Sequence, residues 1–338
     1  MSNGELAQVV EALEPDQIPR GRIARLLVEV AHDGLSRPIQ LPVLVARGER
    51  PGPVFGLTAA LHGNELNGIP VIQRLFSRLD PKTLRGTVVG VIVVNVPGYL
   101  NHERYFEHWD LNHMFPGRPN GNAASVYVSR VMERIVEKFD LLIDLHTASF
   151  GRVNSLYVRA DMTQAESARM AYLQRPQIIV HNPPSDRTLR GAAGELGIPA
   201  ITLEIGNPGR FHRDFIKRSL TGLRAVLTHH KMTRNRAINP GAPPVLCDRS
   251  SWIYTDRGGL LEVFPQVTET VEEGQLIARL STPFGDLIRD YHAPHDGVVI
   301  GHSINPVAET GARILHLGIP ARPNDPRFIP REPPAKTE

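Results

Sequence analysis

Residues 54–79 read VFGLTAALHGNELNGIPVIQRLFSRL, and this stretch decides the fold class. Its first eight residues form a β-rich run that ends at His62, and apolar residues from Leu66 to Leu79 then recur at helical spacing. This order predicts a strand followed directly by a helix. The same alternation recurs from about residue 22 to about residue 230 and predicts an α/β fold, in which helices cover both faces of one sheet.

Further elements are predicted from the runs on either side of this stretch. We expect strands at 22–30, 39–46, 86–95, 140–146, 156–160, 177–181 and 199–206. We expect helices at 126–139, 163–174, 187–197 and 213–230, and a long irregular segment at 95–124.

The 338-residue chain has the composition of a globular protein, with 41% hydrophobic and 22% charged residues. This argues against disordered, collagen-like, coiled-coil and disulfide-scaffold proteins. Its 38 basic and 35 acidic residues leave a net charge of +3, which is too small to indicate a nucleic-acid partner. Neither a signal peptide nor a run of about 20 apolar residues occurs, so we expect a cytoplasmic protein with no membrane partner.

Cys247 is the only cysteine, and we expect a small buried hydrophobe there.

The character of the chain changes after the linker NPGAPP at 239–244, where short, Gly-punctuated strands replace the helices. We therefore expect an α/β domain at 1–238, an all-β domain at 245–318 and an extended Pro-rich tail at 319–338. The all-β region resembles a biotinyl/lipoyl-like barrel-sandwich domain, but its APHDG turn and neighbouring residues lack the lysine that carrier domains modify. We expect it to pack beside the functional site and narrow access to it, or to mediate homo-oligomerisation.

Ionisable side chains stand at the carboxyl ends of three predicted strands. His62 and Glu65 follow the first, His146 ends the second and Glu204 ends the third. Because the carboxyl ends of strands converge in open α/β sheets, we expect these side chains to lie together. A His-x-x-Glu pair with a distant second His forms a His₂Glu set, which leaves a fourth zinc position open, as in catalytic sites. Asp144 would orient His146 through a hydrogen bond.

Each of these residues also has a purely structural explanation. Glu65 would cap a helix, His146 would be a core histidine bonded to a backbone carbonyl, and Asp144 would be a solvent-facing acid. A His₂-carboxylate set is also shared with iron oxygenases. The clustering at strand ends favours a metal site, and the HGNE context favours zinc.

Four motifs make a family resemblance specific. HGNE at 62–65, DLN with FPG at 110–117, DLHT at 144–147 and TLEIG at 202–206 occur in the order of the succinylglutamate desuccinylase and aspartoacylase family. The chain resembles this branch of the zinc carboxypeptidase-like hydrolases. The resemblance implies one zinc ion held by His62, Glu65 and His146, with Glu204 as general base. It also implies a mixed sheet between helices with a small β domain at the C-terminus.

The resemblance further implies that Arg104 polarises the carbonyl of the bond to be cleaved. The family's DLN is usually followed by an arginine that grips a substrate carboxylate, whereas this sequence has His113. Histidine lacks the planar, permanently charged fork of arginine. We therefore hypothesise that N-acetylaspartate and succinylglutamate are not the main substrates, and that Asn112, His113, Arg118 and Arg152 bind a different head group.

Three functions are compatible with these residues. The leading prediction is a zinc-dependent amidohydrolase that cleaves the amide bond of a small N-acylated amino acid or related amide. The second is a metallocarboxypeptidase, which shares the zinc set and the base but needs an open groove and a carboxylate-binding arginine. The third is a non-catalytic binding protein on this scaffold, which loss of a ligand or of the base would favour.

Overall fold

The computed structural model describes residues 6–184, 187–234 and 242–328. Its strands are β1 (Gln8–Val10), β2 (Arg22–His32), β3 (Pro38–Arg47), β4 (Arg50–Ala59), β5 (Arg85–Val91), β6 (Leu141–His146), β7 (Arg152–Asn154), β8 (Leu156–Ala160), β9 (Ile178–His181), β10 (Ala200–Ile205), β11 (Val245–Tyr254), β12 (Gly259–Val263), β13 (Thr270–Val271), β14 (Leu276–Ser281), β15 (Leu287–His292), β16 (Gly297–Ser303), β17 (Val307–Ala308) and β18 (Arg313–Pro320). Its α-helices are α1 (Gly68–Phe76), α2 (Val96–Leu100), α3 (Ala123–Arg134), α4 (Ala165–Leu173), α5 (Leu189–Glu195) and α6 (Arg213–His229). Short 3₁₀ helices are η1 (Pro15–Gln17), η2 (Leu111–His113), η3 (Val136–Lys138) and η4 (Pro326–Phe328).

A large mixed sheet runs through the described part of the molecule. Within the described residues it has 14 strands in the order β1-β2-β3-β5-β4-β6-β10-β8-β9-β11-β18-β16-β13, with β7 attached to β16. Strands β5, β4, β6 and β10 are parallel, and β3 and β8 flank them in the antiparallel direction. The predicted α/β class is confirmed.

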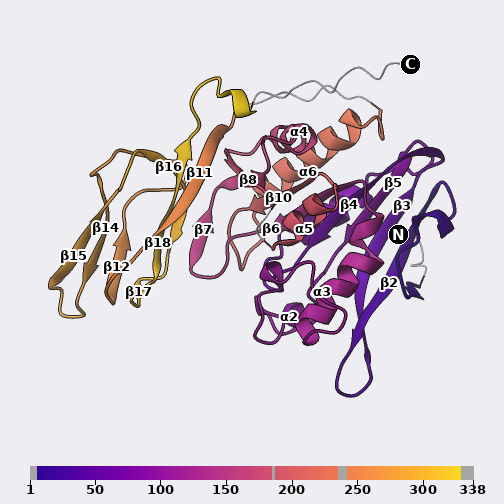
Figure 1. Ribbon diagram of the computed structural model, residues 1–338, viewed down its shortest axis with the longest axis horizontal. Coiled ribbons are helices and arrows are strands. Elements are labelled where there is room, and N and C mark those ends of the chain that lie inside the picture. Colours follow the sequence, from indigo (N-terminus) through magenta and orange to yellow (C-terminus); the bar gives the residue numbers. More distant parts are fainter. Residues whose placement is uncertain (1–5, 185–186, 235–241, 329–338) are drawn as a thin grey trace.

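Helices cover both faces of the α/β half of this sheet (Figure 1). Helices α1, α4 and α6 pack in one apolar cluster, which also receives Ile143 and Leu145 of β6. Helices α3 and α5 pack in a second cluster, which receives Leu142 of the same strand. Successive side chains of a strand point to opposite faces, so β6 is buried on both. This explains why the sequence of β6 is a continuous apolar run rather than an alternating one.

The sheet brings the predicted site residues to one edge. Strands β4, β6 and β10 are adjacent, and their register pairs Ala59 with Leu145 and His146 with Glu204. Because the three strands are parallel, the residues at and just after their carboxyl ends meet on the same side. The expected convergence is therefore observed. The segment at 95–124, predicted to be irregular, contains the short helices α2 and η2 and the first residues of α3.

The C-terminal β region is joined to the α/β half by strand pairing. Strand β11 runs parallel to β9 and antiparallel to β18, so the main sheet continues into this region. Strand β7 of the α/β half pairs with β16. A separate four-stranded sheet, β15-β14-β12-β17, has its own apolar cluster at the end of the molecule (Figure 1). The predicted domain boundary between residues 238 and 245 stays a prediction. The main sheet contains strands from both sides of it, because β9 pairs with β11.

The last described residues are folded against the α/β half. Strand β18 extends to Pro320, past the predicted start of the tail at 319. Phe328 is buried and its ring lies 5.0 Å from that of His181. Residues 321–327 are exposed or half-buried, and Phe328 packs in the apolar cluster of α1, α4 and α6. The extended tail at 319–338 stays a prediction, and 329–338 lie outside the described residues. Cys247 is a buried free thiol, as expected, and burial raises its pKa to about 12.

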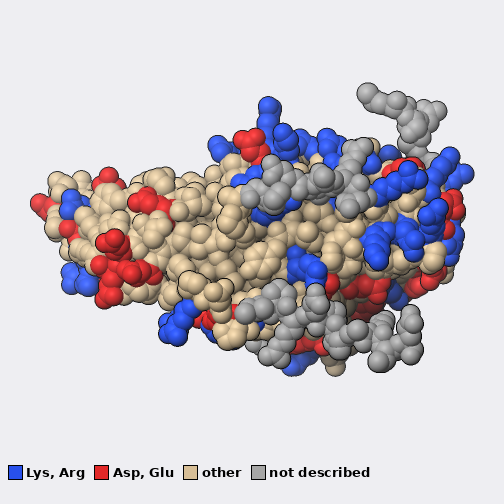
Figure 2. All heavy atoms as spheres, turned by 90° about the horizontal axis from the view of Figure 1, so that it is seen from above, with Lys and Arg blue, Asp and Glu red and all other residues tan. Residues whose placement is uncertain are grey.

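In the described residues, no helix is long and apolar enough to cross a membrane. Figure 2 shows one face of the molecule, where basic side chains are more numerous over the α/β half and acidic groups and uncharged surface lie between them.

Candidate active site

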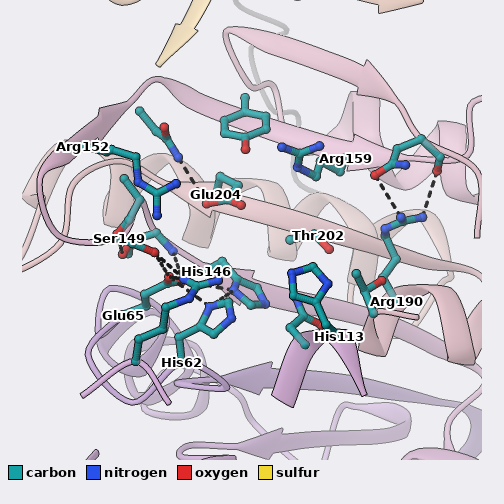
Figure 3. A pocket seen from close by; sticks show the side chains of 18 of the residues that line it. His62, Glu65, His113, His146, Ser149, Arg152, Arg159, Arg190, Thr202 and Glu204 are labelled. Atoms are coloured by element: carbon teal, nitrogen blue, oxygen red, sulfur yellow. Dashed lines mark hydrogen bonds and ion pairs between the residues drawn. The ribbon is translucent and has the colours of Figure 1, made fainter. Parts of the chain in front are cut away.

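Three buried side chains from the strand ends form the centre of the site. His62 and Glu65 follow β4, and His146 ends β6. His62 Nδ1 lies 3.0 Å from Glu65 Oε1, His146 Nδ1 lies 3.1 Å from Glu65 Oε2, and the two Nδ1 atoms are 3.2 Å apart. Figure 3 shows the three side chains pointing toward one another. The structure thus brings the predicted ligand set together.

The outer nitrogen of each imidazole is held by a carboxylate. His62 Nε2 lies 3.0 Å from Asp110 Oδ1, and His146 Nε2 lies 2.7 Å from Asp144 Oδ2. Asp144 is fully buried and also accepts a 2.6 Å hydrogen bond from Thr58 Oγ1. With Nε2–H donating outward, both Nδ1 lone pairs are directed into the cluster. Such carboxylate partners orient metal-ligating histidines in proteins.

This donor set fits a zinc ion. Zinc ligands in a tetrahedral site at ordinary Zn–N and Zn–O distances stand about 3.3 Å apart. Here the two Nδ1 atoms are 3.2 Å apart, and each lies 3.0–3.1 Å from one of the two Glu65 carboxylate oxygens. Burial lowers the pKa of His146, but the Asp144 and Glu65 carboxylates outweigh this effect and raise it well above its ordinary value. The surroundings therefore stabilise a positive charge at this point, which a metal ion would supply.

Arg104 is fixed beside the cluster. Its Nη1 donates to Glu65 Oε1 at 2.7 Å and to Ser149 Oγ, and its Nε and Nη2 donate to Asp110 Oδ2 at 3.1 and 2.9 Å. Burial would raise the pKa of Glu65, but His62, His146 and Arg104 hold it well below its ordinary range. A guanidinium has five N–H groups, so one N–H of Nη2 has no partner among the described residues. That group is available to a substrate oxygen.

Glu204 lies on β10 next to the cluster and is the register partner of His146. Asn154 Nδ2 lies 3.5 Å from its Oε2. Burial, together with the negative charge of Glu65, raises the pKa of Glu204 above its ordinary value, although His146, Arg159 and His62 oppose the shift. A carboxyl group with a raised pKa is suited to accept and return a proton.

These groups open into a cavity of about 340 Å³. Asn112, His113 and Arg152 line it, and their role in substrate binding stays a prediction. Asn112 Oδ1 accepts a hydrogen bond from Leu189 N, whereas His113 is exposed. Figure 3 places Arg152 on one side of Glu204 and His113 with Arg190 on the other.

Arg118 is not brought to this cavity. The chain turns at Gly117, whose φ is +80°, and Arg118 N donates to Ser125 O of α3. Arg118 instead lines a separate depression with Arg187 and Glu195. Its predicted role in substrate binding thus has no geometric basis here.

Sequence reasoning did not single out much of the cavity lining. The additional residues are Thr147, Ala148, Ser149, Asn154, Tyr157, Arg159, Asn182, Thr188, Arg190, Thr202, Trp252 and Arg313. Arg159 carried a weak signal, because it is a basic residue within an otherwise apolar strand, and so did Arg190, which precedes the small apolar residues of α5. Trp252 and Arg313 carried none, since nothing local shows that β11 and β18 reach this cavity.

Comparison with known proteins agrees with this geometry. The family model of the succinylglutamate desuccinylase/aspartoacylase catalytic domain matches residues 51–230, which include the three cluster residues and Glu204. The chain belongs to this family. Its relatives include N-alpha-acetyl-L-2,4-diaminobutyric acid deacetylase of Halomonas elongata, 26% identical over 276 residues that make up 77% of this chain and 80% of that protein. They also include succinylglutamate desuccinylase of Pseudomonas aeruginosa, 29% identical over 170 residues, or 46% of this chain and 51% of that protein.

Solved structures of family members have the same fold. The product-bound ectoine utilization protein EutE (DoeB) of Ruegeria pomeroyi has a TM-score of 0.80 at 21% identity, covering 89% of this chain and 97% of that one. A succinylglutamate desuccinylase/aspartoacylase of Rhodobacter sphaeroides has a TM-score of 0.80 at 21% identity, covering 91% and 98%. The fold of these structures is therefore shared along most of the chain.

Proposed function

We propose that this family member is a zinc-dependent deacylase that hydrolyses the amide bond of a small N-acylated amino acid. The family relatives are amide-cleaving deacylases, which supports a hydrolase. The observation that carries the proposal is the cluster of His62, Glu65 and His146, with a buried carboxyl group of raised pKa at Glu204 beside it.

The roles of the residues follow from their positions. His62, Glu65 and His146 would hold zinc, which supplies Lewis acidity that acidifies water and polarises an acyl oxygen. Glu204 takes a proton from the attacking water and later donates it to the leaving nitrogen. Arg104, anchored by Glu65 and Asp110, directs its remaining N–H to the developing oxyanion.

The cavity favours a deacylase over a metallocarboxypeptidase. Its volume of about 340 Å³ suits a small substrate, and Trp252 and Arg313 of the C-terminal β region form part of its wall. A peptidase needs an open groove instead. The non-catalytic alternative is disfavoured because the ligand set and the base are all present. We propose a cytoplasmic location and a small-molecule substrate. The assay described next includes N-alpha-acetyl-L-2,4-diaminobutyrate, the compound in the name of the Halomonas elongata relative.

The test is elemental analysis of wild-type protein beside His146→Ala, followed by an assay with N-acyl amino acids, N-alpha-acetyl-L-2,4-diaminobutyrate and short peptides. We expect about one zinc per wild-type chain, lost in the variant, and hydrolysis of N-acyl amino acids only. Cleavage of peptides at their C-termini would favour the peptidase. Equal metal content in both proteins, or none in either after zinc is supplied, would move the binding-protein alternative to first place.

A further inference from the structure

One wall of the cavity is built from three strands that are distant in the sequence. It consists of Trp252 on β11, Arg313 on β18 and Arg152 on β7, and we call it the Trp252 wall. The Cζ atom of Arg152 lies 5.6 Å from the centre of the Trp252 ring, and that of Arg313 lies 5.3 Å from it. His316 stacks on the same indole at 4.8 Å with an interplanar angle of 10°. The indole is therefore held in place, and it in turn orients both guanidinium groups.

The two guanidinium groups of this wall lack an acidic partner. Arg104 in the same cavity is paired with Glu65 and Asp110, but no ion pair or hydrogen bond joins Arg152 or Arg313 to a carboxylate in the described part of the chain. Burial lowers the pKa of Arg152, and the positive charges of Arg313 and Arg104 lower it further, which outweighs the opposing effect of the Glu65 and Glu204 carboxylates. Two like charges close together in a partly desolvated site repel each other. An anion placed between them would relieve this repulsion.

The chemistry of the wall selects a carboxylate. A guanidinium offers a planar fork of donors that matches the two oxygens of a carboxylate, and stacking on an aromatic ring pre-organises it. The position after Asn112, where the family resemblance implies a carboxylate-binding arginine, is His113 here. Figure 3 shows His113 and Arg152 on different sides of Glu204. Arg159 and Arg190 line other parts of the cavity, and two further guanidinium groups able to grip a carboxylate bidentately stand on the wall that includes the C-terminal β region.

We propose that Arg152 and Arg313, oriented by Trp252, form the carboxylate-binding subsite of this enzyme. This inference rests on the proposed deacylase function, since the ligand is taken to be the substrate. The carboxylate comes from one of three parts of an N-acyl amino acid: the α-carboxylate, an acidic side chain or an acidic acyl group. Arg152 and Arg313 are specificity-determining residues, and Trp252 is a positioning residue.

The experiment compares four compounds that differ in the position of one carboxylate. N-acetylglutamine is the reference, N-acetylglutamate adds a side-chain carboxylate, N-succinylglutamine adds an acyl carboxylate and N-acetylglutaminamide lacks the α-carboxylate. Binding is measured by calorimetry with zinc-loaded Glu204→Gln protein, and kcat/KM with the zinc-loaded enzyme. Each measurement is repeated with Arg313→Gln and Arg152→Gln. Arg249→Gln is the matched control, because Arg249 is an exposed residue of β11 that does not line the cavity.

We expect one of the three carboxylates to strengthen binding roughly 10- to 100-fold, the range of a hydrogen-bonded ion pair. Arg313→Gln and Arg152→Gln should each remove most of that gain and leave the other two comparisons unchanged, and Arg249→Gln should alter none. The position of the sensitive carboxylate then identifies the part of the substrate that faces the wall. Equal effects on all four compounds, or no effect on any, would overturn the inference.

A further pair of variants tests the positioning role of Trp252. Trp252→Leu removes the aromatic face, and Trp252→Phe keeps it. We expect Trp252→Leu to raise KM for the sensitive compound with little change in kcat, and Trp252→Phe to restore most of the wild-type value. Equal KM values for the two variants would contradict this role.

The two proposals fail in different ways. If the wild-type enzyme hydrolyses none of the compounds but still binds one in an Arg313-dependent manner, the deacylase function is wrong and the subsite stands. If hydrolysis proceeds without dependence on Arg152 or Arg313, the function stands and the subsite is wrong.

Discussion

His146 and Glu204 are register partners on the adjacent parallel strands β6 and β10. The two side chains therefore leave the sheet next to each other, one from a cluster that fits a metal ion and the other from the position that we propose for the general base. The roles that we propose for them are separate, because only His146 has its donor atom within the cluster of His62 and Glu65. Substitutions at the two positions should have different effects.

Glu204→Gln should abolish most of the hydrolysis and leave the metal in place. The amide keeps the size of the side chain but cannot accept the proton, which lowers kcat by about 10²- to 10⁴-fold. Steady-state kinetics and elemental analysis of the same sample check this. A variant that loses its zinc together with its activity would show that Glu204 belongs to the ligand set.

Asp144→Asn should weaken zinc binding while the fold is retained. The carboxylate accepts a 2.7 Å hydrogen bond from His146 Nε2–H, and its loss removes the group that orients this imidazole. We expect zinc affinity to fall about 10- to 100-fold, measured by competition with a chelator. Thr58→Val is the matched control, because it removes only the 2.6 Å hydrogen bond to Asp144 and should have a smaller effect. Unchanged affinity in Asp144→Asn would contradict the orienting role.

Gly63→Ala should disrupt the metal cluster. A Cβ atom at this position would lie 2.1 Å from the backbone carbon of Gly98, so the turn between His62 and Glu65 would have to move away from α2. We expect lower thermal stability and a loss of bound zinc, measured by calorimetric melting and elemental analysis. Gly34→Ala is the control, since no atom lies within 4 Å of its added Cβ. Full zinc content in Gly63→Ala would show that the turn can relax.

His316 should make the protein less stable in acid. It is 2% exposed, and burial, reinforced by Arg159, Arg313 and Arg152, lowers its pKa well below 6.5. The unfolded chain therefore binds a proton below about pH 6.5 that the folded chain does not. Neutral His316 therefore contributes fully to the free energy of unfolding above that pH. This contribution is lost as the pH falls further, by up to about 1.4 kcal/mol per pH unit.

Urea unfolding of zinc-loaded protein at pH 7.5 and 5.5 measures this dependence. His316→Phe keeps an aromatic ring against Trp252 and removes the titrating group, so its stability should change less between the two pH values than that of the wild type. The comparison cancels the contribution of the other histidines. An identical change in both proteins would show that His316 is not the acid-sensitive group.

The order of strands and helices up to residue 230 was predictable because the local spacing of apolar residues distinguishes strands from helices. Residues 54–79 show this best: the observed β4 and α1 fall within the predicted strand and helix apart from the first residues of β4. The pairing of β9 with β11 was not predictable, because the two strands are separated by α5, β10 and α6 and no local pattern encodes which edge a later strand joins.

The cluster of His62, Glu65 and His146 could be predicted from the sequence alone. Each residue stands at or just after the end of a strand within a motif, and parallel strands bring their carboxyl ends together. The tertiary structure alone decided the rest of the cavity. Pairing of β7 with β16 and of β11 with β18 brings Arg152, Trp252 and Arg313 to one wall, and the turn at Gly117 directs Arg118 elsewhere. The physical reason is that the position of each ligand at the end of a strand is encoded by local sequence, whereas the cavity wall depends on which distant strands share hydrogen bonds.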